Sequence, residues 1–279
     1  MRSFRRFLPA VATIGFALLL YGCSDTSTPT GPEDPPNGPD DDDTPVQFNS
    51  EAAPGDSARS FLDDRRFTVL SLEVDYMEGY EPTSDALDSL KTALNAHLSK
   101  SSLHIPTPTQ IPAAGQGPYS TDQVRGLEEE HRNHYTRAES DTLWAYFLVV
   151  DGKYSSENVV GIAYYNTSMA FFGKTIKEIT GGVTKHSREK VEATVFRHEF
   201  GHNLGLVDNG IPMQQDHQDD DNGPHCTNEQ CVMYYAIETT DYFANVFDGT
   251  IPTFEHIKAR KLCNWRSARS SIYAGTALG

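Results

Sequence analysis

A nearly continuous apolar run at residues 143–150, LWAYFLVV, is the feature that most limits how this chain can fold. A strand that is apolar on both faces must be covered on both faces, which is typical of strands inside a sheet with helices on its two sides. Residues 67–76 alternate between apolar and polar side chains, and residues 161–172 are mostly apolar, so each segment is predicted to be a strand.

Helical patterns alternate with these strands. Residues 84–98 carry leucines at helical spacing behind Ser84, which can cap the helix. Residues 121–135 form a charged segment that is predicted to be a second helix, and a long helix is predicted from Ser187 onward. The order strand, helix, helix, strand, strand, helix indicates an α+β fold, in which a mixed twisted sheet has helices packed on it.

Residues 1–22 have the features of a bacterial export signal. Three arginines precede an apolar stretch at residues 8–20, which is shorter than the roughly 20 residues that a membrane-spanning helix needs. The signal ends at Cys23, in a sequence that resembles the lipobox of bacterial lipoproteins, where the cysteine is acylated. We therefore expect lipidation of Cys23 and a location in the periplasm or on the cell surface. The outer membrane is favoured, because Ser24 supplies no strong signal for retention in the inner membrane.

The rest of the chain divides into a linker and one domain. Residues 23–59 are rich in Pro, Gly, Ser, Thr and Asp, offer little to bury, and are predicted to be a disordered linker. Residues 60–279 have enough aromatic and aliphatic side chains for the core of a single domain. The net charge is −16, and the exported part shows no cluster of Lys and Arg, which disfavours nucleic acid as a partner.

The segment from His198 to Asp208, HEFGHNLGLVD, carries the clearest chemical signal. His198 and His202 are four residues apart on the predicted helix, so their imidazoles project from one face and can reach one metal ion. Zinc suits this pair because it accepts neutral imidazole nitrogens at roughly 2.0 to 2.1 Å. Glu199 is placed to take a proton from a metal-bound water and so to act as a general base in hydrolysis. Gly205 is expected to end the helix in a sharp turn.

This spacing resembles the extended zinc motif of the metzincins, a family of zinc metallopeptidases, in which the residue three past the glycine is the third metal ligand. The resemblance implies a metzincin-like fold with an active-site helix and a methionine turn. It also implies a third ligand at Asp208, as in the snapalysin group. Two later histidines, His217 and His225, are the alternatives, because imidazole is the commoner third ligand in this family and a catalytic zinc has three protein ligands.

The expected methionine turn follows the helix in the segment CVMYY at residues 231–235. By the same resemblance, Met233 would pack under the histidines. Tyr235 matches the position from which astacin-like members of the family present a phenol to the zinc and the oxyanion, which implies a catalytic role. The alternative is that Met233 and the tyrosines are ordinary core residues without a role in the active site.

The cysteines add a further likeness. The pattern of His225, Cys226, four residues, Cys231 and Met233 is similar to the archaemetzincins, although the second cysteine that should accompany Cys263 is missing. A second, structural zinc is therefore not expected, and export favours a disulfide between Cys226 and one partner, Cys231 or Cys263. The whole arrangement most resembles lipoprotein metallopeptidases of Bacteroidetes and related bacteria.

An acidic loop at residues 216–221 has oxygen ligands suitable for calcium. No EF-hand spacing is present in it. A solvated loop is therefore favoured over a calcium site.

These resemblances imply a zinc-dependent endopeptidase that hydrolyses polypeptides with metal-activated water and with Glu199 as the general base. The alternative is a non-catalytic surface lipoprotein, an adhesin or a pseudoenzyme, that holds a structural zinc. The presence of Glu199 favours catalysis, because a structural site needs no base. A cell-wall peptide is a third expectation for the substrate.

Replacement of the lipobox cysteine tests the anchor. Cys23→Ala is expected to give an exported protein that no longer partitions with membranes, because the acyl chains supply the membrane affinity. Membrane fractionation of the producing cells measures this, with Ser24→Ala as the control that should stay anchored. Persistent membrane association of Cys23→Ala would contradict the lipoprotein assignment.

Overall fold

The computed structural model describes residues 48–115, 117–181, 185–209, 216–252 and 254. The predicted signal peptide, the lipidation site Cys23, the linker up to residue 47 and Cys263 lie outside the described residues. Within them, no helix has the length and apolar character to cross a membrane.

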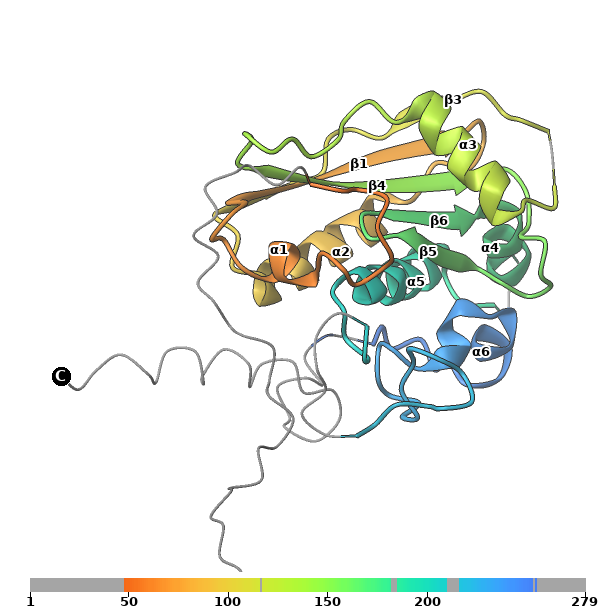
Figure 1. The fold of residues 1–279 in the computed structure, drawn as a ribbon. Coiled ribbons are helices and arrows are strands. Elements are labelled where there is room, and N and C mark those ends of the chain that lie inside the picture. Colours follow the sequence, from red (N-terminus) through yellow and green to blue (C-terminus); the bar gives the residue numbers. More distant parts are fainter. Residues whose placement is uncertain (1–47, 116, 182–184, 210–215, 253, 255–279) are drawn as a thin grey trace, which may run out of the picture. The chain divides into compact units, whose positions relative to one another are not determined.

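The described chain forms one mixed sheet with helices on both sides (Figure 1). The strands are β1 (Val69–Met77), β2 (Ser102–His104), β3 (Thr109–Ile111), β4 (Thr142–Val150), β5 (Gly161–Tyr165) and β6 (Ser168–Phe172). The helices are α1 (Ala58–Leu62), α2 (Ser84–His97), α3 (Thr121–His131), α4 (Gly173–Thr180), α5 (Arg188–Asn203) and α6 (Thr240–Asn245), with one 3-10 turn, η1 (Tyr235–Glu238).

The strand order is β2-β1-β4-β6-β5, and β3 also pairs with β1. All these pairings are parallel except that of β5 with β6, which is antiparallel and leaves β5 at the edge of the sheet. This confirms the predicted α+β class with a mixed sheet.

Strand β4 shows why the apolar run constrains the fold. Its residues alternate between two hydrophobic cores, one on each face of the sheet. Phe147 and its same-face neighbours contact the core that contains α2 and α5, whereas Leu148 belongs to the core that contains Val124 of α3. The sheet therefore separates α3 from α1, α2 and α5 (Figure 1).

The single strand predicted at residues 161–172 is in fact a hairpin. Strands β5 and β6 pair with each other, and Asn166 and Thr167 form the turn between them. Apolar content alone does not distinguish one long strand from two short ones. The buried side chains of Asn166 and Thr167 are the polar interruption that marks the turn.

Two predicted boundaries are also corrected. Residues 48–59, predicted as linker, pack on the hairpin: Asn166 donates to the carbonyl of Asn49 at 2.9 Å, and Thr167 donates to the carbonyl of Ser50 at 3.0 Å. This segment is ordered by hydrogen bonds to its backbone, which a composition rich in small polar residues does not reveal. The predicted helix 121–135 ends at His131, because the Glu73 carboxylate accepts the backbone N–H groups of Asn133 and His134, both at 2.8 Å, and draws the chain into an extended path.

A buried ion pair joins α3 to the sheet. Arg132 Nη1 lies 2.7 Å from Glu128 Oε1, and the two side chains are 0% and 4% exposed. The same guanidinium donates to Ser168 Oγ and to the carbonyl of Trp144, so it bonds to both β6 and β4. Each charge is therefore compensated inside the fold, as buried charges require.

Removal of that arginine should be far more costly than removal of an exposed one on the same helix. Arg132→Met is expected to lower the free energy of unfolding by about 3 to 5 kcal/mol, because it leaves Glu128 buried without a partner. Arg125 forms a surface ion pair with Asp122, at 3.3 Å and with side chains 41% and 90% exposed, and its guanidinium lies 4.8 Å from the centre of the Tyr165 ring. Both contacts are at the surface, so Arg125→Met should lower the free energy of unfolding by only about 1 kcal/mol. Urea unfolding of both variants measures the difference, and equal effects would contradict this role of Arg132.

Candidate metal centre

Helix α5 carries the first part of the site. Its residues from 191 to 203 are all buried, and His198, Glu199 and His202 lie together in its C-terminal half. Gly205 follows with φ +63°, and the N–H of Leu206 donates to the carbonyl of Gly201 at 3.3 Å, which closes the helix end. The sequence prediction that Gly205 ends this helix is confirmed.

The second part of the site comes from residues 225–238. One ligand atom from each of four residues, His198, His202, His225 and Glu238, lies within 4.8 Å of all the others. His225 reaches this place because the N–H of Cys226 donates to the carbonyl of Met233 at 2.7 Å, which folds the long loop back against the methionine segment. Glu238 is the last residue of η1.

Backbone carbonyls orient two of the three imidazoles. His198 Nδ1 lies 2.7 Å from the carbonyl of Val232, and His225 Nδ1 lies 2.6 Å from the carbonyl of Asn222. A carbonyl can only accept, so each Nδ1 carries the proton, and each Nε2 offers its lone pair to the centre of the cluster. Metal-binding histidines in proteins are commonly oriented in this way.

The distance between the two helix imidazoles fits a shared ion. His198 Nε2 and His202 Nε2 are 3.3 Å apart. Two nitrogens in a tetrahedral site, each roughly 2.0 to 2.1 Å from zinc, are separated by about 3.3 Å. His225 Nε2 is buried and has no hydrogen-bond partner among the described residues. The donor set thus fits a metal ion.

The charges of the cluster also suit a cation. Burial, with a smaller effect from His225, lowers the pKa of His198 to about 4, and burial lowers the pKa of His202 well below its usual value. Burial opposes ionisation of Glu238, but the neighbouring His225 and His198 outweigh it and hold the Glu238 pKa below its usual value. Burial opposes protonation of His225, but the neighbouring Glu238 outweighs it and raises the pKa of His225. Two neutral imidazoles and a carboxylate, with His225 beside that carboxylate, therefore face the same point.

Glu199 lies beside this cluster and is 1% exposed. Neither carboxylate oxygen has a hydrogen-bond partner among the described residues. Burial, followed by the charge of Glu238, raises the pKa of Glu199 well above its usual value, against a smaller lowering by the nearby backbone N–H of Ala163. Space for the carboxylate exists because Gly161 has no side chain: a Cβ there would lie 2.9 Å from Glu199 Oε1.

Met233 packs against α5. It is fully buried, and a Cβ on Gly201 would lie only 2.3 Å from its sulfur. The glycine between the two helix histidines therefore lets the methionine pack directly against this turn of α5. Tyr235 is half-buried at the start of η1, and its ring packs on Tyr234 at 4.9 Å. Its expected contact with the metal stays a prediction.

The preferred third ligand is different from the sequence expectation. Asp208 is exposed, has φ +41°, and is not part of the cluster, and His217 is not part of it either. In the turn after α5, the carbonyl of Asn209 packs so closely against Gly205 and Gly55 that a Cβ on either glycine would clash with it. Asp208, in the same turn, is exposed to solvent. His225, one of the two alternatives, lies in the cluster and is therefore the candidate third ligand.

Glu238 was missed by the sequence analysis. It follows Met233 by five residues, but no spacing rule connects a carboxylate at that distance to the histidines on α5. The only available signal was its closeness in sequence to the methionine turn.

One further expectation is corrected. Cys226, expected in a disulfide, is a buried thiol whose sulfur accepts the N–H of Asn228 at 3.4 Å, while Cys231 is disulfide-bonded. Within the described part of the acidic loop, no group of ligands suitable for calcium is formed. There the Asp219 carboxylate accepts hydrogen bonds from Asn222 and from the N–H of Asp221.

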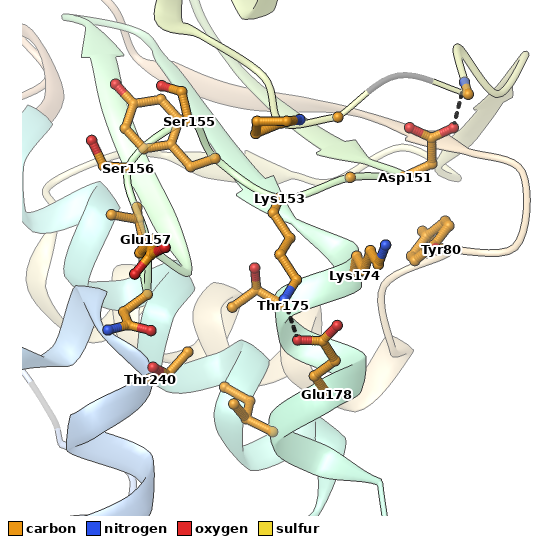
Figure 2. A pocket seen from close by; sticks show the side chains of 18 residues that line it. Tyr80, Asp151, Lys153, Ser155, Ser156, Glu157, Lys174, Thr175, Glu178 and Thr240 are labelled. Atoms are coloured by element: carbon orange, nitrogen blue, oxygen red, sulfur yellow. Dashed lines mark hydrogen bonds and ion pairs between the residues drawn. The ribbon is translucent and has the colours of Figure 1, made fainter.

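A large pocket of about 880 Å³ lies beside the start of β5 (Figure 2). Asp151, Lys153, Lys174 and Glu178 contribute charges of both signs to its lining, and Lys153 Nζ lies 2.6 Å from Glu178 Oε2. None of the four cluster residues lines it. One lining residue, Thr240, follows the cluster residue Glu238 by two positions in the sequence.

Comparison with known proteins gives distant structural matches. No protein-family model and no curated protein sequence matches this chain. Among solved structures, it is similar to the archaemetzincin from Methanopyrus kandleri, with a TM-score of 0.40 and 14% identity over 61% of this chain and 82% of that chain. It is also similar to the archaemetzincin from Archaeoglobus fulgidus complexed with malonate, with a TM-score of 0.35 and 13% identity over 60% of this chain and 85% of that chain. Because these similarities are so distant, they carry no argument about function.

Single replacements test which residue completes the metal centre. His225→Ala is expected to weaken zinc binding by more than about 100-fold, beyond the roughly 10- to 100-fold that loss of an outer partner costs. Asp208→Ala and His217→Ala are the matched controls and should bind zinc as the unchanged protein does. Competition with a chromophoric chelator measures all three, and tight binding by His225→Ala would remove it from the ligand set.

Proposed function

We propose that this chain is a zinc-dependent endopeptidase whose metal is held by His198, His202 and His225. The observation that carries the proposal is the arrangement of a buried carboxylate without a hydrogen-bond partner, Glu199, beside three imidazoles that face one point. When bound, zinc would polarise a substrate carbonyl and lower the pKa of a bound water. Zinc is favoured over calcium because the donors are mainly imidazoles rather than oxygens.

The residues around the metal have separate tasks in this proposal. Glu199 accepts a proton from the attacking water and delivers it to the leaving amine, so it serves as general base and then as general acid. Tyr235 is the candidate to donate a hydrogen bond to the developing oxyanion.

Strand β5 is the proposed binding strand for an extended polypeptide. It is half-exposed and lies at the edge of the sheet, where its outer backbone groups can pair with another chain. Its first residue, Gly161, contacts Glu199, so a chain paired along β5 would pass beside the general base. The pocket near the start of β5 can take side chains of that substrate (Figure 2).

We further propose that the protein acts as an exported lipoprotein anchored through Cys23. The support is the N-terminal sequence, with its positive region, short apolar stretch and lipobox-like end.

A second candidate function is a non-catalytic lipoprotein with a structural metal site. Glu238 favours this candidate, because it brings the number of protein ligands to the four that are typical of structural zinc. A structural site, however, has no use for Glu199, and burial of an unpaired carboxylate costs free energy. The peptidase therefore accounts for more of the geometry.

A conservative change at the general base distinguishes the two functions. Glu199→Gln is expected to keep zinc bound at the level of the unchanged protein while peptide turnover falls by about 100-fold or more, since a positioned base contributes about that factor. Zinc analysis and cleavage of a mixed peptide library measure the two effects.

Glu189→Gln is the matched control for this experiment, because Glu189 is a partly exposed carboxylate in the first turn of the same helix and is not part of the cluster. It should retain full turnover. Near-normal turnover by Glu199→Gln would remove Glu199 from the mechanism. A zinc-loaded, unchanged protein that cleaves no peptide of the library would favour the non-catalytic function.

A further inference from the structure

Glu238 differs from the three histidines with which it forms the cluster. Its side chain is 33% exposed, whereas the side chain of His225 is 9% exposed and His198 is 0% exposed as a residue. It is also the only one of the four that belongs to a single 3-10 turn, η1, rather than to a long helix or the long loop. Glu238 can therefore leave the cluster toward solvent more easily than the others can.

The position of the carboxylate is that of a metal ligand rather than that of an outer partner. An outer partner would accept a hydrogen bond from the Nδ1 of His225, but that proton goes to the carbonyl of Asn222. Instead, Glu238 Oε2 faces the Nε2 of His225 at 3.7 Å, which is too long for a hydrogen bond. Two ligand atoms at such a separation can both bind one central ion.

The backbone of Glu238 is held by the residues just before the edge strand β5. The N–H of Val160 donates to the carbonyl of Glu238 at 2.7 Å, and the N–H of Thr240 donates to the carbonyl of Asn158 at 2.8 Å. Val159 and Thr239 thus form an antiparallel bridge next to the start of β5. The chain at residues 238–240 pairs at the edge along which the proposed substrate would pair.

We propose that Glu238 is a fourth protein ligand that closes the metal site in the resting protein. The site opens when this carboxylate turns out to solvent while its backbone stays bonded to Val160. Catalytic zinc sites keep one position free for water and substrate, so the closed arrangement is inactive and the open one is competent. This inference rests on the proposed metal centre and adds a mode of regulation to it.

The test is the access of a small anion to the metal. The full chain is loaded with cobalt(II), whose visible spectrum reports the coordination, and is titrated with azide. Glu238→Ala and Glu238→Gln are expected to change their spectra at azide concentrations that leave the unchanged protein unaffected. Zinc affinity should also fall by about 10-fold or more in both variants, since even loss of an outer partner costs that factor. Glu229→Gln, an exposed carboxylate in the same part of the chain, should behave as the unchanged protein.

Peptide turnover gives a separate readout. If the closed form dominates, Glu238→Ala should cleave the library several-fold faster, because a competent state that is rarely populated reduces the apparent activity. Equal azide responses in the variants and the unchanged protein would overturn the inference. A fall in turnover of Glu238→Ala to the level of Glu199→Gln would also overturn it. A selective azide response without any cleavage by any form would support the fourth ligand and refute the peptidase proposal instead.

Discussion

The hydrogen bond from His198 Nδ1 to the carbonyl of Val232, at 2.7 Å, joins the two segments that build the site. It orients one metal-facing imidazole and holds α5 against the methionine segment. The contact between Gly201 and the Met233 sulfur reinforces this junction, because α5 leaves room there for a large side chain. His225 and Glu238 come into the cluster from either side of Met233. Without this junction, the helix would present two histidines and no further ligand.

The proposed metal site combines features expected of a catalytic centre with one expected of a structural centre. Glu199 is buried without a hydrogen-bond partner, which costs free energy unless a cation or a reacting group compensates it. Glu238 offers a carboxylate at the position that a catalytic centre leaves open. A movable fourth ligand reconciles these features, since the same residues then form a closed site at rest and an open site when Glu238 turns outward.

The sheet positions the parts of the site relative to one another. Strand β4 is covered on both faces, so α5 is packed firmly on one side of the sheet. Strand β5 lies at the edge, and Gly161 brings it against Glu199. The segment that carries Glu238 bonds to the same edge through Val160. The metal cluster, the base and the proposed path of the substrate are therefore all positioned by one edge of the sheet.

The sequence alone determined the parts of this protein that depend on local periodicity. The helix with His198 and His202 on one face, its end at Gly205 and the buried strand at residues 143–150 all follow from repeats of 3.6 or 2 residues and from local turn chemistry. Only the tertiary structure selected His225 over Asp208 and brought Glu238 to the cluster. These choices depend on the bond between Cys226 and Met233 and on the bond between Val160, just before β5, and Glu238. Such contacts join residues far apart in the chain, and no local pattern encodes them.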